Sequence, residues 1–381
     1  MLQPMPFVAF LRAVAPSRAH LLRHRARSRS HWHLPIRYNG GMIRIGIIGL
    51  GFMGKTHYGV YEKNPEAQVV AIADADPKRA AGDLSGGWGN VETGATSDHL
   101  PMDRIRGTTD WRELLAMPEV DVVDICLPTP THVELATAAL ASGKHVVCEK
   151  PLARTSGEAR QIADAAARAK GLFMPAMCMR FWPAWEWLKR AVVEGHYGRV
   201  LSATFRRVGS YPVGWFMNGA MSGGALLDLH VHDTDFVYHV FGRPRGVFSR
   251  GYTGQSGEVD HVVTQYLYDG PHRGTPLVTA EGAWTMAAGF AFTMQYTVVF
   301  ERATADYGLG RKDTLRLYAD GKSQAVPHAA HDGWTGELGY FLECVKTGTR
   351  PQRVTADDAV AGLQIVEAER RSIDSGLVEL V

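Results

Sequence analysis

A glycine-rich stretch around residue 50 constrains the fold of this chain more than any other feature. Residues 43–48 (IRIGII) form an apolar run with one arginine, which is typical of a buried parallel strand. Gly49, Gly51 and Gly54 follow in a GxGxxG arrangement. In such a turn the first glycine permits a tight bend, the second lets a pyrophosphate approach the backbone, and the third allows close helix–strand packing. The stretch therefore predicts a strand–turn–helix unit whose helix N-terminus binds a dinucleotide.

The second expected strand, 68–74, indicates which dinucleotide binds. It ends in Asp74, where a carboxylate can accept hydrogen bonds from the ribose hydroxyls. The same carboxylate repels a 2′-phosphate, which favours NAD. Lys78 and Arg79 lie close by and could accommodate that phosphate, so NADP stays possible.

The body of the chain divides by pattern into two parts. Up to residue 171, strand-like and helix-like segments alternate, which predicts an α/β, doubly wound parallel sheet, a Rossmann domain at 42–171. Residues 172–381 are rich in long β runs, with helices expected near 229–241, 337–345 and 356–375. We expect a second α/β domain there, with a large, mostly antiparallel open sheet that has one covered face. The uncovered face would need a partner, so we expect a homodimer or homotetramer through this sheet.

Residues 1–41 differ from the rest of the chain. They hold seven arginines and no acidic residue, so the remaining body carries 34 basic against 39 acidic side chains. We interpret them as an unstructured extension, either an organelle transit peptide or the product of a mis-assigned start ahead of Met42. The mildly acidic body does not favour nucleic acid as a partner.

Other bulk features exclude further classes of protein. No segment reaches the roughly 18 apolar residues that a membrane helix needs, so we expect no membrane association. The four cysteines form no CxxC pair and are expected to be reduced thiols, which favours a cytoplasmic protein without a zinc site.

Two expected strands end in polar residues at the edge where open α/β sheets bind ligands. Leu127, Pro128 and Thr129 follow one strand, and His132 is either a cofactor contact or a helix cap. Glu149 and Lys150 end the next strand. Lysine can donate to a substrate hydroxyl, stabilise an alkoxide or act as a base, while the alternative is a surface ion pair.

The second half contributes further candidates for the site. If a helix begins near residue 229, Asp228 and His232 stand at i and i+4 and can form a pair suited to proton abstraction. His230 and His232 resemble a metal-binding HxH pair, but side chains at i and i+2 of a helix point apart, so we expect no metal. His230 alone could reach the substrate, Arg180 could hold its polar groups, and Trp215 could stack on a sugar ring or pack in the core.

Taken together, the motifs GLGFMG, AIADAD, ICLPTPTH, GKHVVCEKPLA, MRFWP and GGALLDLHVHD resemble those of the Gfo/Idh/MocA oxidoreductases, and the resemblance runs from residue 42 to 381. It implies a Rossmann domain, a sheet-mediated oligomer, and hydride exchange between C4 of a nicotinamide and a secondary alcohol of a sugar, cyclitol or sugar derivative. Lys150 matches the family's EKP lysine. Asp228 and His232 match its paired Asp and His, with His232 as the general base. His230 departs from the pattern, because the family commonly has a small residue there.

These interpretations give one set of expected sites and two alternative functions. The alternatives are a redox-assisted glycosidase of the same family and a non-catalytic dinucleotide or sugar sensor. A sensor should have lost the lysine or the histidine, and this chain keeps both. The expected catalytic residues are Lys150, Asp228 and His232; the expected substrate contacts are Lys150, Arg180, Trp215, His230 and His232; and the expected cofactor contacts are Gly49, Gly51, Phe52, Met53, Gly54, Asp74, Leu127, Pro128, Thr129, His132, Glu149 and Lys150.

Overall fold

The computed structural model describes residues 40–85, 97–270 and 274–381. All of them belong to one compact unit. The prediction of an unstructured extension falls mostly on residues 1–39, which lie outside the described residues.

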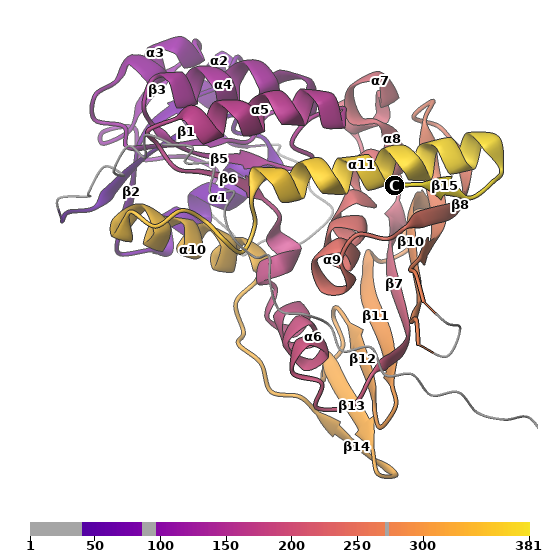
Figure 1. Ribbon diagram of the computed structural model, residues 1–381. Coiled ribbons are helices and arrows are strands. Elements are labelled where there is room, and N and C mark those ends of the chain that lie inside the picture. Colours follow the sequence, from indigo (N-terminus) through magenta and orange to yellow (C-terminus); the bar gives the residue numbers. More distant parts are fainter. Residues whose placement is uncertain (1–39, 86–96, 271–273) are drawn as a thin grey trace, which may run out of the picture. The chain divides into compact units, whose positions relative to one another are not determined.

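The first half forms the expected parallel sheet, in the order β3-β2-β1-β4-β5-β6 (Figure 1). The prediction of a doubly wound α/β fold is confirmed. Strand β6 continues the parallel sheet beyond residue 171, where we had expected the domain to end. The strands of the parallel sheet are β1 (Ile43–Ile48), β2 (Ala67–Ala73), β3 (Arg106–Thr108), β4 (Val122–Ile125), β5 (His145–Glu149) and β6 (Phe173–Ala176).

The helix boundaries in this half follow from local sequence features. The expected helix at 52–63 is α1, which begins directly after the glycine turn. Thr155 and Glu158 form a reciprocal capping box at the start of α5, which satisfies two of the helix's free N–H groups. The helices are α1 (Phe52–Lys63), α2 (Pro77–Ala80), α3 (Trp111–Ala116), α4 (His132–Ala141) and α5 (Ser156–Arg168).

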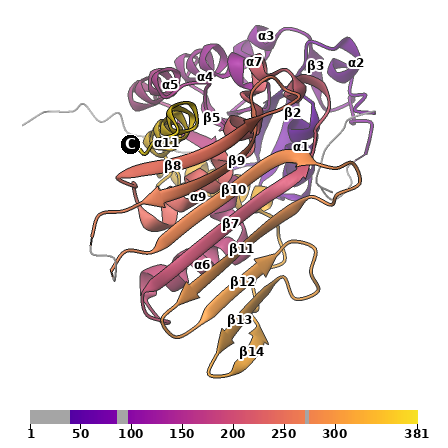
Figure 2. The same cartoon turned by 90° about the vertical axis from the view of Figure 1, so that its right-hand side faces the viewer.

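The second half contains a nine-stranded sheet in the order β14-β13-β12-β11-β7-β10-β9-β8-β15. All neighbouring strands are antiparallel except β7 and β10, so the expected mostly antiparallel sheet is confirmed. Figure 2 shows one face of this sheet open to the viewer, with α6, α9 and α11 behind it. Its strands are β7 (Val200–Ser210), β8 (Gly246–Thr253), β9 (Val259–Leu267), β10 (Leu277–Met286), β11 (Thr293–Phe300), β12 (Thr304–Gly308), β13 (Leu315–Ala319), β14 (Lys322–Ala325) and β15 (Glu379–Leu380).

Burial alternates along the central strands of this sheet, as expected for one covered face. Phe205 and Tyr296 point inward, where they pack around Trp185 of α6. Thr204 and Thr297 point to the open face. The helices and 3₁₀ turns of this half are η2 (Cys178–Phe181), α6 (Pro183–Glu194), η3 (Gly214–Met217), α7 (Gly219–Ser222), α8 (Gly224–Asp228), α9 (Val231–Phe241), α10 (Gly333–Thr347) and α11 (Ala356–Ser375).

The structure corrects one helix that matters for the site. We expected a single helix near 229–241 with Asp228 and His232 on one face. Instead α8 ends at Asp228 and α9 begins at Val231. The N–H of His230 bonds to the carbonyl of Ala225, an i→i−5 contact that widens the turn and interrupts the α-helical ladder.

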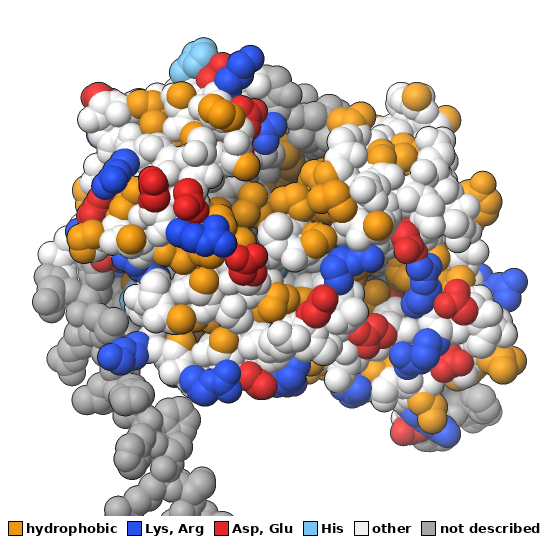
Figure 3. Space-filling model, turned by 90° about the horizontal axis from the view of Figure 1, so that it is seen from above, with side chains coloured by type: hydrophobic (Ala, Val, Ile, Leu, Met, Phe, Trp, Pro, Cys, Tyr) orange, Lys and Arg blue, Asp and Glu red, His pale blue; other side chains and the backbone are white. Residues whose placement is uncertain are grey.

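The surface mixes charges of both signs. Seen from above, Lys and Arg side chains alternate with Asp and Glu, and apolar side chains gather toward the middle of this face (Figure 3). Within the described ranges, no helix is both long and apolar enough to cross a bilayer.

Candidate active site

The glycine turn after β1 has the geometry of a dinucleotide cradle. Gly49 has φ +91°, a conformation that favours glycine. A Cβ on Gly54 would lie 1.9 Å from the carbonyl oxygen of Gly49, so only glycine permits this packing. A Cβ on Gly51 would meet nothing within 4 Å, and no side chain caps α1 there. Open space above an uncapped helix N-terminus suits a pyrophosphate, and Phe52 and Met53 begin that helix.

Asp74 follows β2 directly and accepts a hydrogen bond from the glycine turn. Its Oδ2 accepts a hydrogen bond from the Leu50 N–H at 2.7 Å, and its Oδ1 accepts one from the Asp76 N–H at 2.9 Å. The half-buried carboxylate therefore lies beside the cradle, where the ribose contact was expected.

His132 lies within the protein, between two backbone carbonyls. The ring is fully buried, with Nδ1 3.0 Å from the Pro151 carbonyl and Nε2 2.8 Å from the Leu127 carbonyl. Burial lowers its pKa, so the ring is neutral and only one nitrogen donates. The expected cofactor contact is thus wrong for this residue: His132 ties the loop after β4 to the loop after β5. Thr129 is buried too, while Leu127 and Pro128 are half-buried.

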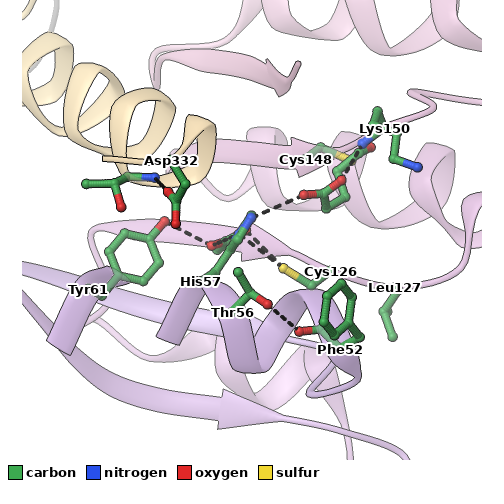
Figure 4. Close-up of polar contacts among 12 residues, drawn as sticks. Phe52, Thr56, His57, Tyr61, Cys126, Leu127, Cys148, Lys150 and Asp332 are labelled. Carbon is green, nitrogen blue, oxygen red and sulfur yellow. Dashed lines mark hydrogen bonds and ion pairs between the residues drawn. The ribbon is translucent and has the colours of Figure 1, made fainter. Parts of the chain in front are cut away.

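Lys150 and Asp228 meet, although 78 positions separate them in the sequence. The Lys150 Nζ donates to the Asp228 backbone carbonyl at 2.8 Å and to its Oδ1 at 3.2 Å. Both side chains are largely buried, and burial raises the pKa of Asp228 although Lys150 opposes the rise. Lys150 extends from the end of β5, away from the cluster around His57 (Figure 4). Lys150 is therefore held by a carboxylate at the ligand-binding edge of the parallel sheet.

His232 is the second residue of α9 and is half-buried. Burial lowers its pKa well below the ordinary value, and the positive charges of Lys150 and Arg207 lower it further. A neutral imidazole beside a lysine can accept a proton. The predicted Asp–His pair is replaced by another arrangement, because the Asp228 carboxylate bonds to Lys150 and the helix breaks before His232.

Arg180 is a structural residue, which overturns the expectation that it binds substrate. Its guanidinium bonds to both oxygens of Asp235, at 2.9 and 2.7 Å, and lies 3.2 Å from Asp358. Only 3% of the residue is exposed. These buried contacts leave no free face for a ligand; they join η2, α9 and α11.

His230 likewise has no surface available to a ligand, because it is fully buried between α9, β9 and α11. Its Nε2 lies 3.4 Å from the Tyr266 hydroxyl and 3.5 Å from a Glu369 oxygen. A Cβ on Gly282 would lie 2.8 Å from its ring, so the sheet makes room for the imidazole with a glycine. The expected substrate contact is therefore wrong.

Trp215 lies in η3, beyond the end of β7, and is half-buried. Its ring stacks on Phe216 at a centroid distance of 4.2 Å. The other face of a stacked ring is the kind of surface a sugar binds, so substrate contact at Trp215 stays a prediction.

Sequence reasoning missed a second polar group near the site, although it named one member, Glu149, as a cofactor contact. His57 of α1, Asp124 of β4, Glu149 of β5 and Glu337 of α10 are all buried. Two signals could have revealed it: a histidine three residues after Gly54, and a glutamate on the otherwise apolar face of α10.

Comparisons with known proteins agree with this fold. Residues 43–177 match the family described as an oxidoreductase family with an NAD-binding Rossmann fold, and residues 185–306 match the GFO/IDH/MocA C-terminal domain. The chain thus belongs to the GFO/IDH/MocA family of NAD(P)-dependent oxidoreductases, and its Rossmann domain belongs to an NAD-binding family.

Three relatives illustrate the likeness. Levoglucosan dehydrogenase of Pseudarthrobacter phenanthrenivorans is 34% identical over 219 residues, 52% of this chain but only 51% of that protein. Myo-inositol 2-dehydrogenase of Thermotoga maritima is 26% identical over 87% of this chain and 96% of its own. The structure of a levoglucosan dehydrogenase complex with NADH and levoglucosan superimposes with a TM-score of 0.76 at 24% identity, covering 89% of this chain and 99% of that chain, which supports the fold.

Proposed function

We propose that this protein transfers a hydride between NAD(P) and a secondary alcohol of a sugar, cyclitol or sugar derivative. The observation that carries the proposal is the contact between Lys150 and Asp228 at the strand edge that also bears the glycine turn. Burial, together with the charge of Lys150, lowers the pKa of His232, which keeps that imidazole neutral. A base and a cation at one alcohol oxygen are what such a reaction needs.

Each residue has a distinct role in the proposed oxidation. His232 removes the hydroxyl proton, and its low pKa keeps it ready to accept one at neutral pH. The Lys150 ammonium faces the oxygen and stabilises the negative charge that develops there. Asp228 holds the ammonium in place through two hydrogen bonds. A bound nicotinamide supplies the hydride acceptor, and in the reverse direction His232 returns the proton.

The substrate class rests on the relatives. Proteins named for levoglucosan, inositol and trans-1,2-dihydrobenzene-1,2-diol share this fold family, and all three names denote cyclic compounds with neighbouring hydroxyls. We infer a cyclic polyhydroxylated substrate, with Trp215 as a stacking surface for its ring.

We also propose a homodimer or homotetramer built through the open face of the nine-stranded sheet. That face carries exposed residues such as Leu201, Val263 and Leu277 among polar neighbours. The residues at 42–171 and 172–381 would act as dinucleotide and substrate domains. Four free thiols suit a cytoplasmic setting.

The test is a screen of cyclic polyols and anhydrosugars with NAD and with NADP, followed by absorbance of the reduced nicotinamide. Turnover that is lost in Lys150→Met and His232→Asn, with NADH binding retained, supports the proposal. Cleavage of glycosides without net NADH would favour the glycosidase alternative. No reaction across the whole panel, despite tight NADH binding, would favour the sensor.

A further inference from the structure

The buried group beneath the site draws its members from four separate elements. His57 lies on α1, Asp124 on β4, Glu149 on β5 and Glu337 on α10, and none is more than 5% exposed. The proposed mechanism uses none of these side chains. Three carboxyl groups around one imidazole, all removed from water, require an explanation.

The contacts form a continuous chain from α1 to Lys150. Nδ1 of His57 lies 2.8 Å from Asp124 Oδ2, and that oxygen also accepts from the Tyr61 hydroxyl at 2.9 Å. Nε2 of His57 lies 3.1 Å from Glu149 Oε1. The second oxygen of Glu149 accepts the backbone N–H of Lys150 at 3.0 Å. Figure 4 shows His57 at the centre of these contacts, with a further contact to the Cys126 thiol.

Glu337 faces this chain without a hydrogen-bond partner among the described residues. Both of its oxygens are buried and unsatisfied, and so is the Nε2 of His57, whose N–H direction misses Glu149. One oxygen of Glu337 lies within 4.8 Å of both His57 and Glu149. The unpaired atoms of Glu337 and His57 therefore share one buried space.

Burial and neighbouring charges determine whether Glu337 and His57 carry a proton. Burial raises the pKa of Glu337 well above its usual value and Glu149 raises it further, so Glu337 keeps its proton. Burial opposes a charge on His57, but Asp124 and Cys126 raise its pKa overall, so the ring is an imidazolium. The groups that act on the Glu337 carboxyl, in addition to Tyr61 and Cys178 nearby, are Glu149, His57, Asp124 and Asp332.

We propose that His57 and Glu337 are positioning residues that act through Glu149 to hold the backbone at Lys150, and so connect the dinucleotide-binding helix to the catalytic lysine. The His57 imidazolium holds one oxygen of Glu149 through the ion pair at 3.1 Å, and the other oxygen accepts the hydrogen bond from the Lys150 N–H. The protonated carboxyl of Glu337 fills the space beside His57 and Glu149 without adding a further negative charge. The inference deepens the proposed function and rests on it for its effect on turnover.

The same atoms could instead bind a divalent cation, which prefers imidazole and carboxylate ligands. The chain of contacts from Asp124 through His57 and Glu149 to Lys150 explains more of the site than a metal does. It accounts for the Asp124 and Lys150 contacts as well as for the unpaired Glu337. A metal would require Glu337 to be ionised. The two arrangements therefore differ in whether the Glu337 carboxyl carries a proton, and this can be measured.

The experiment compares Glu337→Gln, which keeps a donor and the shape, with Glu337→Leu, which keeps only bulk. Glu343→Gln is the matched control, since Glu343 is an exposed residue on the same helix. Difference infrared spectra of the apoprotein at neutral pH should show the carbonyl band of a buried carboxylic acid in the wild type and in Glu343→Gln, but not in Glu337→Gln. Hydrogen exchange at the Lys150 amide should be faster in Glu337→Leu than in Glu337→Gln. Neither readout needs a substrate.

Turnover provides the third readout. Glu337→Leu should lower kcat on the order of 10- to 100-fold, because small misplacement of a catalytic group has effects of that size. The KM should change less, and Glu337→Gln should recover part of the loss. No acid band, unchanged exchange at Lys150, or a stoichiometric metal in the purified protein would overturn the inference. If the first two readouts hold while no substrate turns over, the proposed function fails and the positioning role stands.

Discussion

Replacing Arg180 by methionine separates a structural role from a substrate-binding one. The change leaves the 1%-exposed Asp235 without its partner and removes the ion pair to Asp358. Breaking a buried pair by removing one member costs about 3–5 kcal/mol, because a buried charge is left uncompensated. With a urea m-value of about 3 kcal/mol/M, the unfolding midpoint should fall by roughly 1–1.7 M.

The assay is urea unfolding followed by tryptophan fluorescence, together with steady-state kinetics on the folded variant. Arg160→Met is the control, because it breaks the exposed Arg160–Asp357 pair and should lower stability by less than about 1 kcal/mol. Arg180→Met with Asp235→Asn should recover part of the loss, since the second change removes the stranded charge. An unchanged midpoint combined with a large rise in KM would refute the reasoning and restore Arg180 as a substrate ligand.

Three further predictions follow from the geometry. Gly54→Ala places a Cβ 1.9 Å from the Gly49 oxygen, so the glycine turn must shift and NADH binding should weaken at least about tenfold, or ~1.4 kcal/mol of binding free energy, as fluorescence titration can measure; unaltered binding would contradict the cradle. Asp74→Ser removes a charge that repels a 2′-phosphate and an acceptor for the Leu50 N–H, so the ratio of the dissociation constants of NADPH and NADH should fall; a constant ratio would deny Asp74 this role. Glu337 has a raised pKa in the folded state, so its contribution to stability is full below the unfolded value of about 4.3 and declines as pH rises toward the folded one. Glu337→Gln does not titrate, so its Tm relative to the wild type should climb between pH 5 and 8, and a flat difference would show that Glu337 is ionised.

Local pattern predicted the elements well where the chain decides its own structure. The helix expected after the glycine turn is α1, and the helix expected at 356–375 begins with a capping box at Thr355. Short edge strands such as β3 and β15 were missed, because two or three residues carry no period.

Side-chain roles were harder to predict, because they depend on partners far away in the sequence. Arg180 and His230 follow motifs that suggest a ligand, yet Asp235 and Glu369 from other elements bury them. Lys150 and Asp228 were expected at one site and do lie together, but their direct contact was not foreseen. The broken helix at Leu229 came from an i→i−5 hydrogen bond that no periodicity reveals.

The central claim is that Lys150 and His232 handle the alcohol proton next to a bound nicotinamide. It is tested most directly by the pH dependence of kcat/KM for a substrate found in the screen, measured for the wild type, Lys150→Met and His232→Asn under conditions where all three bind NADH equally. The account predicts activity that is retained down to pH values below the ordinary histidine pKa, and a loss of at least about 10²-fold in each variant. Activity in His232→Asn that matches the wild type would contradict it.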